Sequence, residues 1–199
     1  MNGISALTSR MGQTLRDPRG TAHGLMQLGL PRPVLWQALI AVSIVSTLIG
    51  EASQWVFDMI AQPVTPLMLP GPLIFAIMQT GLLVVTVWLV LGIGRACGGH
   101  GRLEDGMILL TWLEVLRICV QAVQILVLLL SPLLSSLTGA IGLLVMAWVF
   151  THFVAAMHGF TSLIKVFAMI AASFVAAAFV LSILLTLAGV QVIEVPANV

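Results

Sequence analysis

Charged residues are scarce in this chain: Asp, Glu, Lys and Arg make up 8% of its 199 residues, while hydrophobic residues make up 60%. A soluble domain carries about a quarter charged residues, so this deficit excludes that class. The mean hydropathy of +1.14 is typical of an integral membrane protein. The net charge of the chain is only +1, and its eight Lys and Arg residues are scattered along the sequence. They do not form the concentrated basic surface that nucleic acid binding requires, so no nucleic acid partner is expected.

The sequence also lacks the motifs of several enzyme classes. It has no His-Glu-x-x-His for zinc, no Gly-x-Ser-x-Gly turn and no phosphate loop ending in Gly-Lys-Ser/Thr. Its histidines do not supply the opposed pair that a haem b site needs, and the set Cys97, His100 and His158 lacks a fourth zinc ligand. Cys97 and Cys119 are predicted to be free thiols. We therefore predict a protein that is not an enzyme and has no cofactor or metal.

Five apolar runs, each long enough to cross a bilayer as a helix, follow one another along the chain. We predict an all-α, polytopic membrane protein folded as a five-transmembrane-helix bundle. The predicted spans are residues 34–57, 72–93, 107–130, 137–157 and 166–188. They leave an N-terminal segment, 1–33, and a short extracytoplasmic tail, 189–199.

Basic residues are distributed one-sidedly over the predicted loops. Seven of the eight precede the first span or lie on alternate loops after it, namely Arg10, Arg16, Arg19, Arg32, Arg95, Arg102 and Lys165. Positively charged loops are retained in the cytoplasm. We therefore predict a cytoplasmic N-terminus and a C-terminus on the opposite side of the membrane.

The N-terminal segment contains two short stretches of helical pattern, 7–15 and 21–27. The first should end before Asp17-Pro18, because a residue that precedes proline disfavours helical geometry. Two interpretations remain open. The stretches are interfacial helices whose Leu15, Leu25, Met26 and Leu28 contact the membrane surface, or the segment is a weakly ordered tail.

The third predicted span carries four polar residues, Glu114, Arg117, Gln121 and Gln124. At about 100° per residue they fall within an arc of roughly 80° on one helix face. Arg117 lies ten residues beyond Met107, and therefore roughly 15 Å deep in a hydrocarbon core about 30 Å thick. Such a charge must meet partner helices or a wet cavity. This intramembrane polar stripe is either a structural contact between helices, with Glu114 and Arg117 neutralised, or a transport path.

The last predicted span carries a face of small residues. Ala168, Ala172 and Ala176 follow at four-residue steps and therefore line one side of a helix. Small side chains let a neighbouring helix approach closely in a membrane. We predict these three alanines to be helix-packing residues.

Two loop segments rich in glycine and histidine carry a resemblance to a known family. They are Gly98-Gly99-His100-Gly101-Arg102 before the third span and His158-Gly159-Phe160-Thr161-Ser162 before the last. With Leu15-Arg16-Asp17-Pro18-Arg19 leading to Leu30-Pro31-Arg32, this layout resembles the Yip (Ypt-interacting protein) family, in particular its short bacterial members. The resemblance implies five membrane helices and a cytoplasmic N-terminus. Because the likeness is to bacterial members, it also implies a bacterial inner (cytoplasmic) membrane, which makes the predicted C-terminus periplasmic.

The resemblance implies a non-enzymatic integral membrane protein that acts as a scaffold, accessory subunit or membrane organiser. Its expected partners are the lipid bilayer and other integral membrane proteins or itself. Eukaryotic relatives are linked to small GTPases through a longer cytoplasmic N-terminal region, so a small GTPase is not expected to bind this short form. The alternative is a small transporter or proton-conducting protein that uses the polar stripe of the third span.

Overall fold

The computed structural model describes residues 3–61 and 71–187, and in these residues the fold is all-α, as predicted. Seven helices and no strand occur there. The helices are α1 (Gly3–Arg16), α2 (Pro18–Met26), α3 (Arg32–Ala61), α4 (Pro72–Ala96), α5 (Leu103–Leu128), α6 (Pro132–His158) and α7 (Leu163–Leu187). The predicted tail, 189–199, lies outside the described residues.

Four helices, α3 to α6, are long and apolar enough to cross a membrane. In α7 the apolar stretch found among the described residues is shorter, Leu163–Phe179. Four candidate spans are therefore supported in the described part of the chain. The predicted count of five depends on α7 and stays a prediction.

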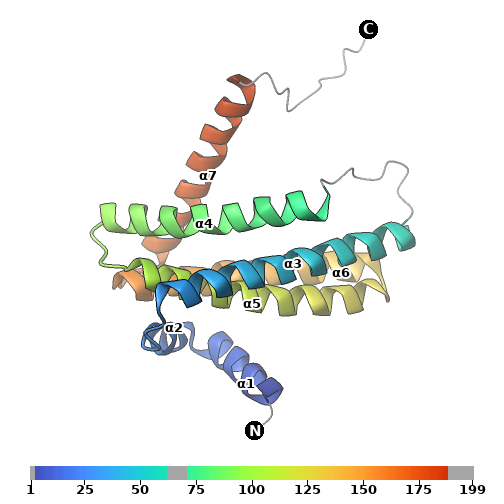
Figure 1. Ribbon diagram of the computed structural model, residues 1–199, viewed down its shortest axis with the longest axis horizontal. Coiled ribbons are helices and arrows are strands. Elements are labelled where there is room, and N and C mark those ends of the chain that lie inside the picture. Colours follow the sequence, from blue (N-terminus) through green and yellow to red (C-terminus); the bar gives the residue numbers. More distant parts are fainter. Residues whose placement is uncertain (1–2, 62–70, 188–199) are drawn as a thin grey trace.

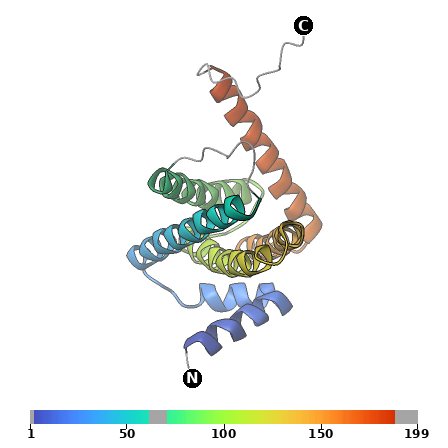
Figure 2. The same cartoon turned by 90° about the vertical axis from the view of Figure 1, so that its right-hand side faces the viewer.

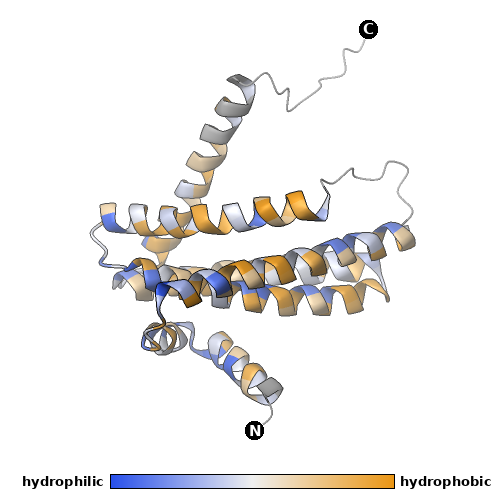
Figure 3. Cartoon of the chain, in the orientation of Figure 1, coloured by the Kyte–Doolittle hydropathy of each residue, from blue (hydrophilic) through white to orange (hydrophobic). Residues whose placement is uncertain are grey.

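The four candidate spans run side by side along the longest axis of the molecule, and α5 lies at their centre (Figures 1 and 2). It packs against α3, α4 and α6, and also against α2. Helix α7 leaves this bundle obliquely and contacts α6 and α4. Hydrophilic residues gather at the ends of the bundle and on α1 and α2, whereas most of α4 is hydrophobic (Figure 3).

Local signals define where several helices begin and end. Asp17 accepts a hydrogen bond from the Gly20 N–H at 2.9 Å, and Pro18 occupies the first position of α2. The Asp17 side chain thus caps α2 by accepting from a free backbone N–H of its first turn. Pro18 suits the first position because it has no N–H that needs a partner. Ser131 and Pro132 start α6 in the same way, ahead of the predicted start at 137.

Helices α1 and α2 form in the segment for which a weakly ordered tail was the alternative. Leu25 is buried and Met26 is partly buried against the apolar core, because α2 packs on α5 and α6. Leu15 and Leu28 are exposed. Leu25 and Met26 thus pack on the protein itself, while contact of Leu15 and Leu28 with the membrane surface stays a prediction.

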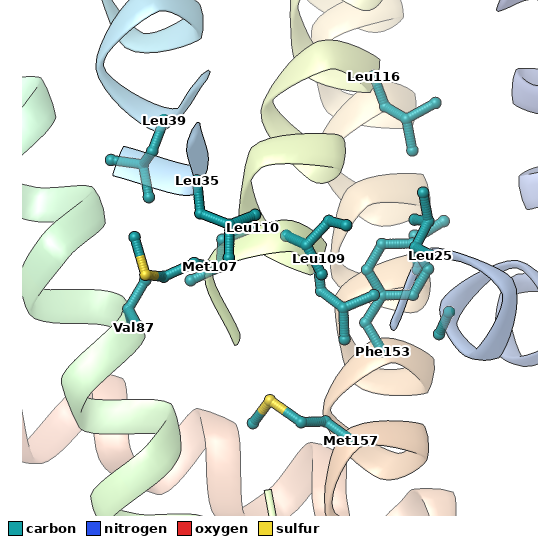
Figure 4. Packing of buried hydrophobic residues seen from close by; sticks show 13 residues of the cluster. Leu25, Leu35, Leu39, Val87, Met107, Leu109, Leu110, Leu116, Phe153 and Met157 are labelled. Carbon is teal, nitrogen blue, oxygen red and sulfur yellow. The ribbon is translucent and has the colours of Figure 1, made fainter. Parts of the chain in front are cut away.

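The apolar core lies at the end of the bundle where α3 and α5 begin and α6 ends (Figure 4). It includes Leu35, Leu39, Met107, Leu110 and Phe153, all nearly inaccessible. A buried leucine or phenylalanine contributes about 1.5–3 kcal/mol in transfer from water. Between two helices in a membrane this gain in transfer free energy is absent, because lipid is as apolar as the side chains. Close packing therefore has to supply the attraction between the helices.

Candidate functional site

Glu114 is the most deeply buried carboxyl side chain of the bundle in the described residues, with 6% of its side chain exposed. Arg117, one turn further along α5, pairs with it. The Arg117 Nε donates to both carboxylate oxygens at 3.0 Å, and Nη2 donates to Oε1 as well. From α4, Gln79 Nε2 donates to Glu114 Oε1 at 3.0 Å. The carboxylate therefore has both a counter-charge and a partner on a second helix, which a charge at this depth requires.

Hydroxyl groups of α3 continue this contact, and the sequence-based prediction did not include them. Ser43 and Thr80 hydroxyl oxygens lie 2.6 Å apart across α3 and α4, and Ser46 donates to Gln121 Oε1 at 3.1 Å. Ser43, Ser46 and Thr47 are buried. Their spacing of three and four residues inside an apolar run was the signal that predicts one polar helix face. We call the whole set the polar seam: Ser43, Ser46, Thr47, Gln79, Thr80, Glu114, Arg117 and Gln121.

Gln124, the fourth residue of the predicted stripe, meets a different helix. Its amide packs against Gly139 of α6, where a Cβ would lie 2.7 Å from Nε2, and its backbone carbonyl accepts the Ser135 hydroxyl at 3.1 Å. The stripe on α5 is therefore shared between neighbours. Glu114 and Gln121 face α4 and α3, whereas Gln124 faces α6.

The apolar core, shown in Figure 4, lies between the polar seam and one end of the bundle, because most of its residues on α5 come before Glu114 and those at the start of α3 come before Ser43. Met107, Ile108, Leu109 and Leu110 are buried in the second turn of α5, between its start and Glu114. Conduction requires polar or wet groups across the whole membrane. The polar seam supplies polar groups over only part of the membrane depth. Its carboxylate and amide groups are hydrogen-bonded to other side chains of the protein.

A second polar centre, His158, lies at the end of α6 and is 2% exposed. The Gly101 N–H donates to Nδ1 at 3.2 Å, and Nε2 lies 3.2 Å from the Val90 carbonyl oxygen. Since Nδ1 accepts, Nε2 carries the ring proton. A Cβ at Gly94, Gly99 or Gly101 would come within 3 Å of the imidazole ring. These three glycines leave the space that His158 occupies, and we call this arrangement the His158 junction.

The His158 junction brings together the two loop segments that carry the family resemblance. Gly98 and Gly159 adopt φ of +88° and +75°, and these left-handed turns end α4 and α6. Arg95 donates through Nε and Nη2 to the Gly101 carbonyl at 3.1 and 3.0 Å. Arg19 of α2 donates to the Phe160 carbonyl at 3.0 Å. Segments far apart in sequence are thus tied together at one end of the bundle.

The four histidines do not assemble into a ligand set. His23 and His100 are exposed, and His152 Nδ1 lies 2.8 Å from the carbonyl oxygen of Trp148 in its own helix. His158 uses both ring nitrogens on protein groups, so it has no free lone pair for a metal. In the part of the chain that the structure describes, no three His, Cys, Asp or Glu side chains are placed to hold a metal ion.

The small-residue face of α7 points away from the described helices. Ala168, Ala172 and Ala176 are all exposed. No helix among the described residues covers them, so their role as helix-packing residues stays a prediction.

Comparison with known proteins identifies one relationship. A family model described as the Yip1 domain matches residues 12–185, which include α2 to α6, nearly all of α7 and part of α1. No curated protein and no solved structure matches the chain.

Removing one member of the Glu114–Arg117 pair should destabilise the bundle, because the other member is left as a buried charge at a cost of about 3 to 5 kcal/mol. The effect should be unequal. Arg117→Met strands the buried Glu114 carboxylate, whereas Glu114→Gln leaves Arg117, whose side chain is 34% exposed. We expect Arg117→Met to lower the melting temperature in detergent more than Glu114→Gln does.

The double variant Glu114→Gln/Arg117→Met should be more stable than the sum of the two single changes indicates, because neither charge remains. Single variants that both melt like the wild type would show that the pair does not stabilise the fold.

Adding a methyl group at Gly94 should displace the His158 ring, and overpacking of this kind costs about 1–3 kcal/mol. We expect Gly94→Ala to lower the melting temperature, while Gly92→Ala, whose Cβ meets nothing within 4 Å, does not. Both substitutions gain the higher helix propensity of alanine over glycine, so this gain cancels when the two melting temperatures are compared. In a Gly94→Ala/His158→Ala chain the ring is absent, so the Gly94 substitution should cost much less. Strictly additive changes would contradict the contact.

Proposed function

We propose, from the premise that the chain belongs to the Yip1 domain family, that it is a non-enzymatic membrane protein acting as a scaffold, accessory subunit or membrane organiser. We place it in a bacterial inner membrane as five spans, with the N-terminus cytoplasmic and the C-terminus periplasmic. Its partners in this proposal are the bilayer and other integral membrane proteins or a second copy of itself.

The observation that carries this proposal is the division of polar and apolar surface. The polar seam is turned inward and bonded within the bundle, while the outer faces of α4 and α7 expose large apolar side chains. Among them are Leu73, Ile77, Leu82, Phe167 and Phe174. A protein whose polar seam is bonded internally and whose outer faces are apolar offers lipid and other membrane helices a surface for packing.

The exposed alanine face of α7 supports the same proposal. Ala168, Ala172 and Ala176 permit a helix to approach closely, and within the described chain no helix uses them. A partner helix against this face would also hold α7 in a membrane-spanning orientation, as a fifth span.

One observation favours the alternative, a small transporter or proton-conducting protein. Arg117 keeps about a third of its side chain exposed at mid-membrane depth, as a residue facing a wet cavity does. The apolar core on one side of the polar seam opposes this function, because it provides no polar group for a proton or solute to follow.

The proposed orientation rests on the loops at one end of the bundle. The start of α3 and the connections α4–α5 and α6–α7 lie at that end (Figure 1). Arg32, Arg95, Arg102 and Lys165 lie in these connections or in the helical turns next to them. An alkaline phosphatase fusion after Val199 should be active and one after Arg102 inactive, because the enzyme folds only outside the cytoplasm. The reverse pattern would overturn the orientation.

Purification of the full chain in mild detergent tests the function. A scaffold should remain bound at fixed stoichiometry to a second copy or to another membrane protein. We expect Ala172→Phe to weaken that association by blocking close approach, whereas Ala178→Phe, an exposed alanine outside the stripe, should preserve it. A strictly monomeric chain that moves protons or solute in liposomes would establish the alternative.

A further inference from the structure

Helices α4 and α7 meet and then diverge, and an apolar crevice of about 270 Å³ lies between them and α6. Val85 and Leu89 line it from α4, Phe150 from α6, and Met169 and Phe174 from α7. The residues on α4 extend from Leu82 to Ile93, and this length corresponds to roughly 16 Å of helix. The crevice is therefore long, and exposed apolar side chains such as Leu82, Val85 and Phe174 line it.

A second pocket, of about 350 Å³, adjoins the end of this crevice near the start of α7. Its polar lining comes from Cys97, Thr161, Ser162 and Lys165, and no acidic residue lines it. Met169 lines both cavities. An apolar channel at membrane depth thus leads to a positively charged, hydroxyl-bearing pocket at the end of the bundle.

We propose that the crevice and the pocket together bind one anionic phospholipid. One acyl chain occupies the crevice between α4 and α7, and the phosphate of the headgroup lies against the Lys165 ammonium and the Thr161 and Ser162 hydroxyls. The lipid comes from the leaflet at the end of the bundle where α4 ends and α7 begins. This site does not depend on whether the chain acts as a scaffold.

The charges around the pocket favour an anion. Within the described residues Lys165 takes part in no ion pair. Arg19, the nearest basic residue on α2, is occupied with the Phe160 and Thr161 carbonyls and fixes the loop that carries Thr161. Lys165 is therefore available to a phosphate, and lysine residues at a membrane surface attract anionic headgroups.

The pairing of an apolar crevice with a basic pocket favours a lipid over a partner helix. A hydrocarbon chain suits the apolar lining, and the headgroup of the same molecule reaches Lys165. A partner helix would account for the apolar crevice but not for the pocket that contains Lys165.

Cys97 offers a direct measure of occupancy, because it is exposed and lines the pocket. The full chain with Cys119→Ala is reconstituted in phosphatidylcholine vesicles with or without phosphatidylglycerol, and labelling of Cys97 by a neutral maleimide is followed. Phosphatidylglycerol should slow the labelling several-fold. Native mass spectrometry of the detergent-purified protein should show one phosphatidylglycerol retained per chain.

Two pairs of variants separate the proposed site from a general effect of surface charge. Lys165→Gln should abolish the protection, while Arg102→Gln, an exposed basic residue at the same end, should keep it. Ala177→Phe fills the crevice and should also abolish protection, while Ala178→Phe, which does not line it, should keep it. The retained lipid should follow the same pattern.

The proposal is overturned if Cys97 reacts equally fast in both kinds of vesicle, or if Lys165→Gln and Arg102→Gln retain the same protection. It is equally overturned if inorganic phosphate protects Cys97 to the same extent in pure phosphatidylcholine vesicles, since the pocket would then bind a free anion without the chain.

Discussion

The burial of the Glu114 carboxylate is the constraint on which the arrangement of the bundle depends. A charge at this depth is stable only with a counter-charge and further hydrogen bonds. Arg117 supplies the first from the same helix, and Gln79 supplies the second from α4. Gln121 in turn accepts a hydrogen bond from Ser46 on α3. The hydrogen bonds that the polar side chains of α5 require therefore determine which helices surround α5 and which faces of those helices turn inward. The centre of the bundle is therefore defined by polar contacts, which retain their specificity where hydrophobic attraction between helices is absent.

The His158 junction applies the same principle at the end of the bundle. An imidazole with one donor and one acceptor is enclosed by two backbone groups, and three glycines allow the chain to approach it. The Arg95 and Arg19 side chains then tie the loops on either side. Since these loops connect α4 to α5 and α6 to α7, the junction sets the positions from which α7 departs.

The polar side chains of the bundle interior bond to one another, whereas the outer faces of α4 and α7 are apolar. The interior is committed to holding the helices together. The remaining chemistry lies at the periphery, in the apolar faces of α4 and α7, the exposed alanines and the cavity that ends at Lys165. Interaction with lipid and with other helices follows from those surfaces, and the membership of the chain in the Yip1 domain family is consistent with it.

The sequence by itself determined the class of the protein, its helical content and the polar residues on α5. In hydrocarbon, backbone groups must bond within a segment, so long apolar runs become helices whatever their neighbours are, and Asp17 and Ser131 mark helix starts through local hydrogen bonds. The tertiary structure alone decided which partner each polar residue meets, because one helix face can contact several neighbours. It placed Gln124 against α6 while Glu114 faces α4, and it brought His158 into contact with Gly101, which lies 57 residues away in the sequence. It also decided that α2 packs on the bundle and that the alanines of α7 remain exposed, since small or apolar side chains do not specify which surface will cover them.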